Sequence, residues 1–363
     1  MINTTLDMIN ATFLTNLSLT KTFNEEVKTE RFNTVNITTL ILFSVIFLVG
    51  TIGNALVLYY FHVKDRHLGM STEKRRVSEF LFSVLAIVDF FAAFLNPILY
   101  MYWIVTDYKW HLGYWSCKIL VPLGTVATTM SGGIIAVLSF DRHRAIVYPL
   151  KKHFKLFHIK ISIVLVLFYA LVINVYYSIN ISLNIKKECF VVDPSKKAYS
   201  IPTIIYFLVN DITLLFVINF TNYRIVSKRL VLSSSSTPIK MQTISDCKRR
   251  QKDNNRIIRL LVVMTIVFFI LTLPRDVLHF VFLMSWLIGS GINRSKEVLN
   301  LNSFLKVFNV ANSCVNPIIF YAMHPGFNKF IKSIFCKSKC LFPNRKISLN
   351  EMETLAGNKS VIY

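Results

Sequence analysis

The chain has 363 residues and a net charge of +22; hydrophobic residues make up 53% of it and charged residues only 17%. Its mean hydropathy is positive, and this composition excludes an ordinary soluble globular domain. The basic charge by itself would allow a nucleic-acid partner, but its placement along the chain, given below, argues for no nucleic acid.

Residues 1–38 are polar and contain no basic start followed by an apolar run, so we expect an extracellular tail and no cleaved signal peptide. Four Asn-x-Ser/Thr glycosylation sequons lie in this tail, at Asn3, Asn10, Asn16 and Asn36. Asn180 and Asn293 open further sequons near predicted outward loops. Asn219 opens one inside a predicted helix, where it should be silent. The cluster predicts a glycosylated amino terminus outside the cell.

Seven segments are long and apolar enough to cross a bilayer, which takes about 20 helical residues. They are Thr39–Phe61, Phe80–Trp103, Ile119–Phe140, Ile159–Ile181, Ile201–Val226, Ile257–Trp286 and Leu301–Met323. Backbone groups cannot remain unpaired in lipid, so each segment should be an α-helix. The sequence therefore predicts an all-α, seven-helix membrane domain over residues 39–324. A cytoplasmic surface helix and tail follow over residues 325–363.

Most of the 41 Lys and Arg residues lie in the loops and tail on one side of these segments. This is the positive-inside bias of membrane proteins, and it also places the amino terminus outside, in the plasma membrane. Contact with anionic membrane lipids and with an acidic partner is a second use of the same charge.

The six cysteines divide by compartment. Cys117 and Cys189 face the oxidising side, so we expect a disulfide between them. After the last segment, residues 326–336 place apolar side chains on one face and lysines on the other, which predicts an amphipathic helix on the inner membrane surface. Cys336 and Cys340 are candidates for palmitoylation there, with unmodified thiols as the alternative.

Several polar residues lie inside the apolar segments. They are Asn54, Asp89, Ser131, Asn312, Ser313 and Asn316. A carboxylate inside a membrane is costly unless it has a partner, so Asp89 indicates either an interhelical hydrogen-bond cluster or a functional site. Hard oxygen ligands suit sodium. The second hypothesis is therefore a sodium ion bound by Asp89 with oxygens of Ser131 and Asn316, and with Asn312 and Ser313 nearby.

Several motifs occur in one order along nearly the whole chain: "GTIGN" with Asn54, "LAIVD" with Asp89, "WHLG" before Cys117, "DRH" from Asp141, and "NSCVNPIIF" up to Phe320. Together they resemble the rhodopsin-like family of G-protein-coupled receptors. The resemblance implies a receptor, not an enzyme, that binds an extracellular ligand and activates a heterotrimeric G protein. Arrestin is a further expected partner. No cofactor is required, although an allosteric sodium ion is suspected.

The resemblance also implies a switch, in which Asp141 holds Arg142 at rest and releases it on activation to receive the G protein. The remaining switch residues are Tyr223, Asn316, Pro317 and Phe320. The chain departs from the family pattern at several positions. His143 and Phe320 replace tyrosines, Thr272 replaces a tryptophan, Leu215 replaces a proline, and Asn254 replaces the acid that locks the arginine in some members.

Five ionisable residues should face the outer half of the bundle: Asp211, Arg275, Asp276, His279 and Lys306. They either pair among themselves or bind a ligand that carries both signs, or a free or amidated terminus. The resemblance disfavours an amine ligand, because Gly124 stands where amine receptors carry an aspartate. It also disfavours retinal, because Val310 stands at the lysine position. A neuropeptide or peptide hormone is the first hypothesis, and a small carboxylate or lipid mediator is the second.

Two other classes were weighed. A transporter should show inverted repeats and broken helices, and the sequence shows neither. A membrane enzyme needs a nucleophile–base pair or a metal set, but no HExxH, GxSxG or P-loop motif is present. A membrane transporter therefore remains only a remote alternative.

Overall fold

The computed structural model describes residues 33–67, 73–148, 154–191, 196–234, 244–289 and 295–340. Within these ranges the chain is almost entirely helical. The helices are α2 (Thr34–His67), α3 (Glu73–Val105), α4 (Tyr114–Val147), α5 (Leu156–Asn180), α6 (Lys197–Phe207), α7 (Leu214–Ser234), α8 (Ile244–Ile288), α9 (Lys296–Met323) and α10 (Pro325–Cys340). A π-helical turn, η1 (Leu208–Thr213), joins α6 to α7, so these three elements form one continuous fifth span.

The predicted seven-helix bundle is confirmed, and each predicted segment coincides with one span. The helices are longer than the predicted segments, because hydropathy detects only the part of a helix that lies in the hydrocarbon layer. Helix α2 already begins at Thr34, so Asn36 lies in its first turn rather than in a tail. Helix α8 has 45 residues, which is roughly 68 Å at 1.5 Å per residue.

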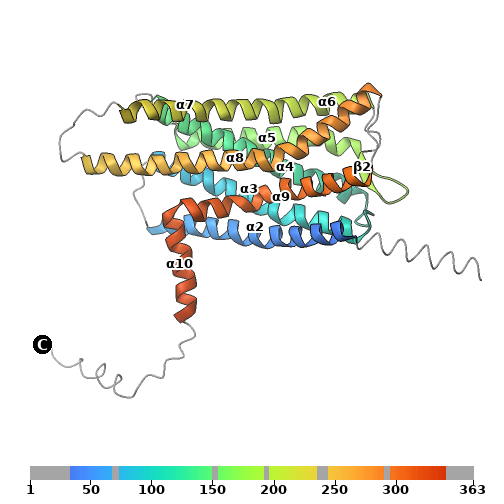
Figure 1. Ribbon diagram of the computed structural model, residues 1–363, viewed down its shortest axis with the longest axis horizontal. Helices are drawn as coiled ribbons and strands as arrows, with labels where there is room; N and C mark the ends of the chain where they lie inside the picture. The colour runs from blue at the N-terminus through green and yellow to red at the C-terminus, as the bar shows by residue number, and fades with distance from the viewer. Residues whose placement is uncertain are drawn as a thin grey trace, which may run out of the picture.

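Figure 1 shows the long helices lying side by side, with α10 turning away from the bundle at one end and the β hairpin at the other. We call these the α10 end and the disulfide end. The hairpin pairs β1 (Ile181–Leu183) with β2 (Cys189–Val191) in antiparallel register, with Ile181 opposite Val191.

Helix α10 is amphipathic, as predicted. Phe327 and Ile331 are buried against the bundle, while Lys329 and Lys332 are exposed. The ring of Phe327 lies 5.5 Å from the ring of Tyr60 on α2. The steep angle to the bundle and the exposed lysines suit a helix that lies along a membrane surface.

The seventh helix differs from its prediction in one respect. Among the described helices, six are long and apolar enough to cross a membrane, and α9 is not one of them. Its asparagines and charged residues lower its hydropathy. Helix α9 nevertheless packs against α2, α3 and α8, and Asn312, Ser313 and Asn316 are buried. Helix α9 is held in the bundle by polar side chains that face its neighbours. Such side chains lower the average hydropathy of the helix.

The main apolar core lies between α2, α3, α4, α7, α8 and α9. Its most deeply buried members include Leu81, Ile134, Ile135, Ile218 and Leu261. Close packing on α4 depends on Gly132, where an added Cβ would lie 3.0 Å from Leu214 and 3.1 Å from Phe268. The core therefore holds α4 tightly between α7 and α8.

Candidate functional site

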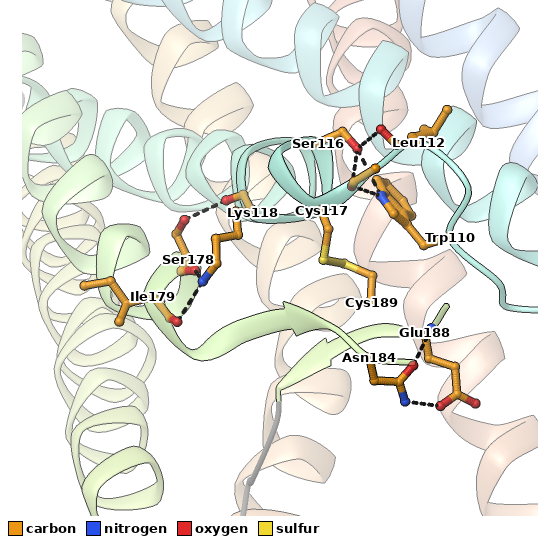
Figure 2. Close-up of a disulfide and its surroundings, with 11 residues drawn as sticks. Trp110, Leu112, Ser116, Cys117, Lys118, Ser178, Ile179, Asn184, Glu188 and Cys189 are labelled. Atoms are coloured by element: carbon orange, nitrogen blue, oxygen red, sulfur yellow. Dashed lines mark hydrogen bonds between the residues drawn. A yellow bond between two sulfur atoms is a disulfide. The ribbon is translucent and has the colours of Figure 1, made fainter. Parts of the chain in front are cut away.

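The disulfide end is closed by the predicted bond. Cys117, near the start of α4, is bonded to Cys189 in β2, and their Cα atoms lie 5.9 Å apart. Figure 2 shows this bond joining the β hairpin to α4. A second link lies beside it, because Lys118 Nζ donates to the carbonyl oxygens of Ser178 at 3.1 Å and Ile179 at 3.0 Å. Helix α4 is thus fixed to both the hairpin and the end of α5.

The "WHLG" motif forms a compact turn before α4. The Trp110 indole N–H donates to the Gly113 carbonyl and to Ser116 Oγ, each at 3.0 Å. Gly113 has a φ of 90°, a conformation that favours glycine. The indole is buried against the rings of Tyr102 and Trp103. This turn positions Cys117 for its bond to the hairpin.

The five predicted ligand residues come together around Arg275. Arg275 Nη1 donates to Asp276 Oδ1 at 3.4 Å, so the internal pairing weighed for these two residues is formed. Asp211 lies within electrostatic range of both Arg275 and Asp276. His279 and Lys306 lie within range of Arg275. We call these five residues the mixed-charge cluster; it holds two carboxylates, two strong bases and an imidazole.

Tyrosines that the sequence did not predict as site residues lie around the mixed-charge cluster. Tyr100, Tyr177 and Tyr206 all lie within electrostatic range of Arg275. Lys306 Nζ lies 5.5 Å from the centre of the Tyr100 ring, and the Tyr206 hydroxyl lies 3.0 Å from Thr129 Oγ1. The chain has 15 tyrosines, and no spacing separates these from the others. Only the packing of α3, α5, α6 and α8 shows that they share a site.

Asp211 lies within the π-helical turn η1. In η1, Thr213 Oγ1 donates to the Leu208 carbonyl at 3.2 Å, five residues earlier. Such a turn accommodates one extra residue and rotates the side chains that follow, and it is common at functional sites. Leu215 stands where the family pattern has a proline, but a π turn leaves no hydropathy signal.

The predicted sodium residues are also brought together. Ser131 Oγ donates to Asp89 Oδ1 at 3.1 Å, and Asn316 Nδ2 donates to Asp89 Oδ2 at 2.6 Å. Asp89 is 1% exposed. A small cavity beside it is lined by polar groups that include Asn96, Asn312 and Ser313.

This arrangement is the interhelical hydrogen-bond cluster that was one hypothesis for Asp89. Its oxygen atoms also suit a bound cation. The Asp89 carboxylate and the Ser131 hydroxyl oxygen are hard ligands that border the cavity. Asn316 presents its amide nitrogen, not its oxygen, to Asp89, so it serves the carboxylate as a donor. Ser131 and the cavity wall are therefore better placed than Asn316 to supply oxygen ligands.

The "DRH" motif lies toward the α10 end of α4. Arg142 Nε donates to Asp141 Oδ2 at 2.9 Å, and Arg142 Nη2 donates to the same oxygen. Arg142 is only 2% exposed, so the pair is shielded from water. Next to it, His143 Nε2 and Asn222 Oδ1 are buried with no hydrogen-bond partner among the described residues.

The other predicted switch residues divide into two groups. Asn316, Pro317 and Phe320 lie inside the bundle on α9, where Gly53 allows α2 to approach the Pro317 ring. Tyr223 is instead 69% exposed on the outer side of α7. The structure therefore does not bring Tyr223 to the Asp141–Arg142 pair.

Several candidate modification sites lie partly or wholly outside the residues that the structure describes. Asn3, Asn10, Asn16 and Asn293 lie outside the residues that the structure describes. Cys336 and Cys340 lie in the last turns of α10, but their side-chain positions are not among those described, and the same holds for Asn254 on α8. Glycosylation and palmitoylation at these positions stay predictions.

Similarity to known proteins decides the family. Residues 53–320 match the family described as 7 transmembrane receptor (rhodopsin family). The chain belongs to this family. The receptor is 28% identical over 333 residues to galanin receptor 2a of Danio rerio, covering 88% of the receptor and 83% of that relative.

Two further relatives are similar at comparable identity. The receptor is 26% identical over 323 residues to "Probable G-protein coupled receptor 34" of Pan troglodytes, covering 86% of the receptor and 79% of that relative. It is 26% identical over 265 residues to the Phe13-bombesin receptor of Bombina orientalis, with coverage of 69% and 66%. As a member of this family, the receptor is a multi-pass membrane protein that couples an extracellular ligand to a G protein, and it is not an enzyme.

Proposed function

We propose that the receptor binds a peptide, such as a neuropeptide or peptide hormone, at the disulfide end. The observation that carries this proposal is the mixed-charge cluster, whose Arg275 lies within electrostatic range of Tyr177, a residue packed against the disulfide-bonded hairpin. Two carboxylates and two strong bases in one region suit a ligand that carries both signs. The surrounding tyrosines add apolar area and hydroxyl groups that suit peptide side chains and backbone. The names of the galanin and bombesin receptors agree with a peptide ligand.

The same reasoning orients the receptor. A disulfide forms and persists in an oxidising compartment, so the disulfide end should face outward and the amino terminus with it. The lysines of α10 should then face the cytoplasm and contact anionic membrane lipids. The G protein would dock at the α10 end, beside Arg142, and arrestin would compete for the same surface.

A sodium ion is proposed as an allosteric ligand of the Asp89 cavity. Its support is the pair of oxygen donors from Asp89 and Ser131 beside a polar cavity. When bound, the ion would offset the buried carboxylate charge and hold α3 and α4 together.

A second candidate ligand is a small carboxylate or lipid mediator. It is favoured by the position of His279 and Lys306, both within electrostatic range of Arg275. A site with three basic side chains would bind a single acidic group if Asp276 were already satisfied by Arg275.

The test is a screen of secreted peptides and of small carboxylates on cells that express the receptor, with nucleotide exchange on a G protein as the readout. For the activating ligand, Arg275→Gln and Asp276→Asn should each reduce potency, because each removes one sign of charge. Lys186→Gln, in the exposed hairpin turn, is the matched control and should leave potency unchanged. Activation by carboxylates alone would favour the second candidate. Unchanged potency in both cluster variants would overturn the proposed site.

A further inference from the structure

The outer face of the fifth span carries a regular row of exposed side chains. Its members lie in α7, after the π turn, and are Phe216, Asn219, Tyr223 and Val226. Successive members are separated by three, four and three residues. This is the spacing of the seam by which two helices pack in a left-handed pair. We call this row the seam.

Asn219 is the unusual member of the seam, because it is a polar residue at a depth that lipid occupies. The fifth span runs from Lys197 to Lys228. At 1.5 Å per residue, Asn219 lies about 10 Å from its midpoint, inside the half-thickness of about 15 Å of the hydrocarbon core. Among asparagines of known burial in the described helices, Asn219 is the only exposed one.

The carboxamide of Asn219 is only partly satisfied within the chain. Its Nδ2 donates to the Leu215 carbonyl at 2.8 Å, and no described residue donates to its Oδ1. Polar groups without partners are unfavourable in hydrocarbon, and a partner on another helix removes the penalty. Lipid acyl chains can pack against Phe216, which is 70% exposed, but they cannot hydrogen-bond to Asn219.

We propose that the seam is a dimer interface in which Asn219 pairs with Asn219 of a second copy of the receptor. A carboxamide has both a donor and an acceptor, so it complements an identical group. Two copies in one membrane share the same orientation, and a two-fold axis along the membrane normal therefore brings the same residue of each copy together. One polar residue in an otherwise apolar seam also fixes the register of a parallel helix pair.

The position of the fifth span in the bundle allows this contact. Figure 1 shows α6 and α7 along one edge of the bundle, and the seam residues of α7 are exposed there. Helix α5 also has an outward apolar face, with Val164, Leu165 and Phe168 exposed. That face shows no exposed carboxamide among its described residues, so it has no comparable determinant of partner or register. It serves as the control surface.

Energy transfer between donor-labelled and acceptor-labelled full-length receptors in lipid vesicles tests the proposal, with the protein-to-lipid ratio varied. Asn219→Leu keeps the size and removes the hydrogen bonds, and it should weaken dimerisation about 3- to 20-fold. Asn219→Gln retains a carboxamide and should restore dimerisation to within about twofold of the parent, by the same principle. Equal dimerisation of the parent and Asn219→Leu, or no dimerisation of the parent, would overturn the proposal.

Cross-linking tests the same surface without changing Asn219. Phe216→Cys and Phe168→Cys are matched, because both phenylalanines are exposed on membrane-facing helices. Both would be made in a background with Cys247, Cys336 and Cys340 replaced by serine. Oxidation should cross-link copies through position 216 and not through position 168. The reverse result would assign the dimer contact to α5 and reject the seam.

Discussion

Removal of the Cys117–Cys189 bond tests how the disulfide end is held together. The two cysteines are 72 residues apart, and the chain-entropy relation gives about 4 kcal/mol for a loop of that length. That value is too large for this receptor, because α4 and α5 lie between the cysteines and stay helical in the membrane. Lys118 also fixes α4 to the end of α5, at Ser178 and Ile179.

The chain that the bond constrains therefore runs only from Ile179 to Cys189, about ten residues, for which the same relation gives about 2.7 kcal/mol. If ligand binding needs an ordered hairpin, Cys117→Ser and Cys189→Ser should each weaken affinity by up to roughly 100-fold. The double variant should be little worse than either single one, because both changes remove the same bond.

Ligand affinity, measured on receptors normalised for surface expression by an epitope tag, checks this expectation. Lys118→Met should add to the loss only when the disulfide is absent, because the lysine is then the remaining link to α5. Additive losses from the two cysteine variants would show that they act separately and would refute the reasoning.

Three further predictions concern the interior of the bundle. Asp89→Asn should abolish any effect of sodium on agonist affinity, because the charge that attracts the ion is gone; an equal sodium effect in parent and variant would reject the ion site. Arg142→Ala should preserve ligand binding and abolish nucleotide exchange, whereas Asp141→Asn should raise basal exchange because it removes the acceptor of the arginine; normal signalling by Arg142→Ala would remove the assigned role. Gly124→Ala should lower the melting temperature in detergent, because its Cβ would lie 2.0 Å from Asn96 Oδ1, and overpacking of this kind costs about 1–3 kcal/mol; an unchanged melting temperature would mean that Asn96 moves freely.

Much of the fold could be predicted because each helix that crosses a membrane needs a long apolar segment, which is visible in the sequence. Hydropathy located the spans, and the position of Cys117 and Cys189 on the oxidising side predicted the bond that the structure shows. The juxtaposition of Asp89 with Asn316 followed from the cost of a lone carboxylate in lipid. These predictions depend on properties that a residue keeps whatever its neighbours are.

The rest depends on packing, which the sequence does not display. Asp211 lies in the π turn of the fifth span and Tyr223 lies exposed beyond it, and no residue pattern marks that turn. Helix α9 is held by buried asparagines, so its hydropathy understates its place in the bundle. The tyrosines near Arg275 come from several helices, and only their assembly makes them one site.

The packing of the Phe320 ring has a mechanical consequence. Its ring lies 5.6 Å from Phe61, 5.0 Å from Phe82 and 5.9 Å from Phe327, and it stacks on His324 at 5.2 Å. These contacts join the end of α9 to α2, α3 and α10 through one aromatic cluster. An inward movement of that end would have to separate several rings at once or take α10 with it. The surface helix and the last turns of α9 should therefore move as one rigid unit, so that whatever holds α10 to the membrane also resists the conformational change that admits a G protein.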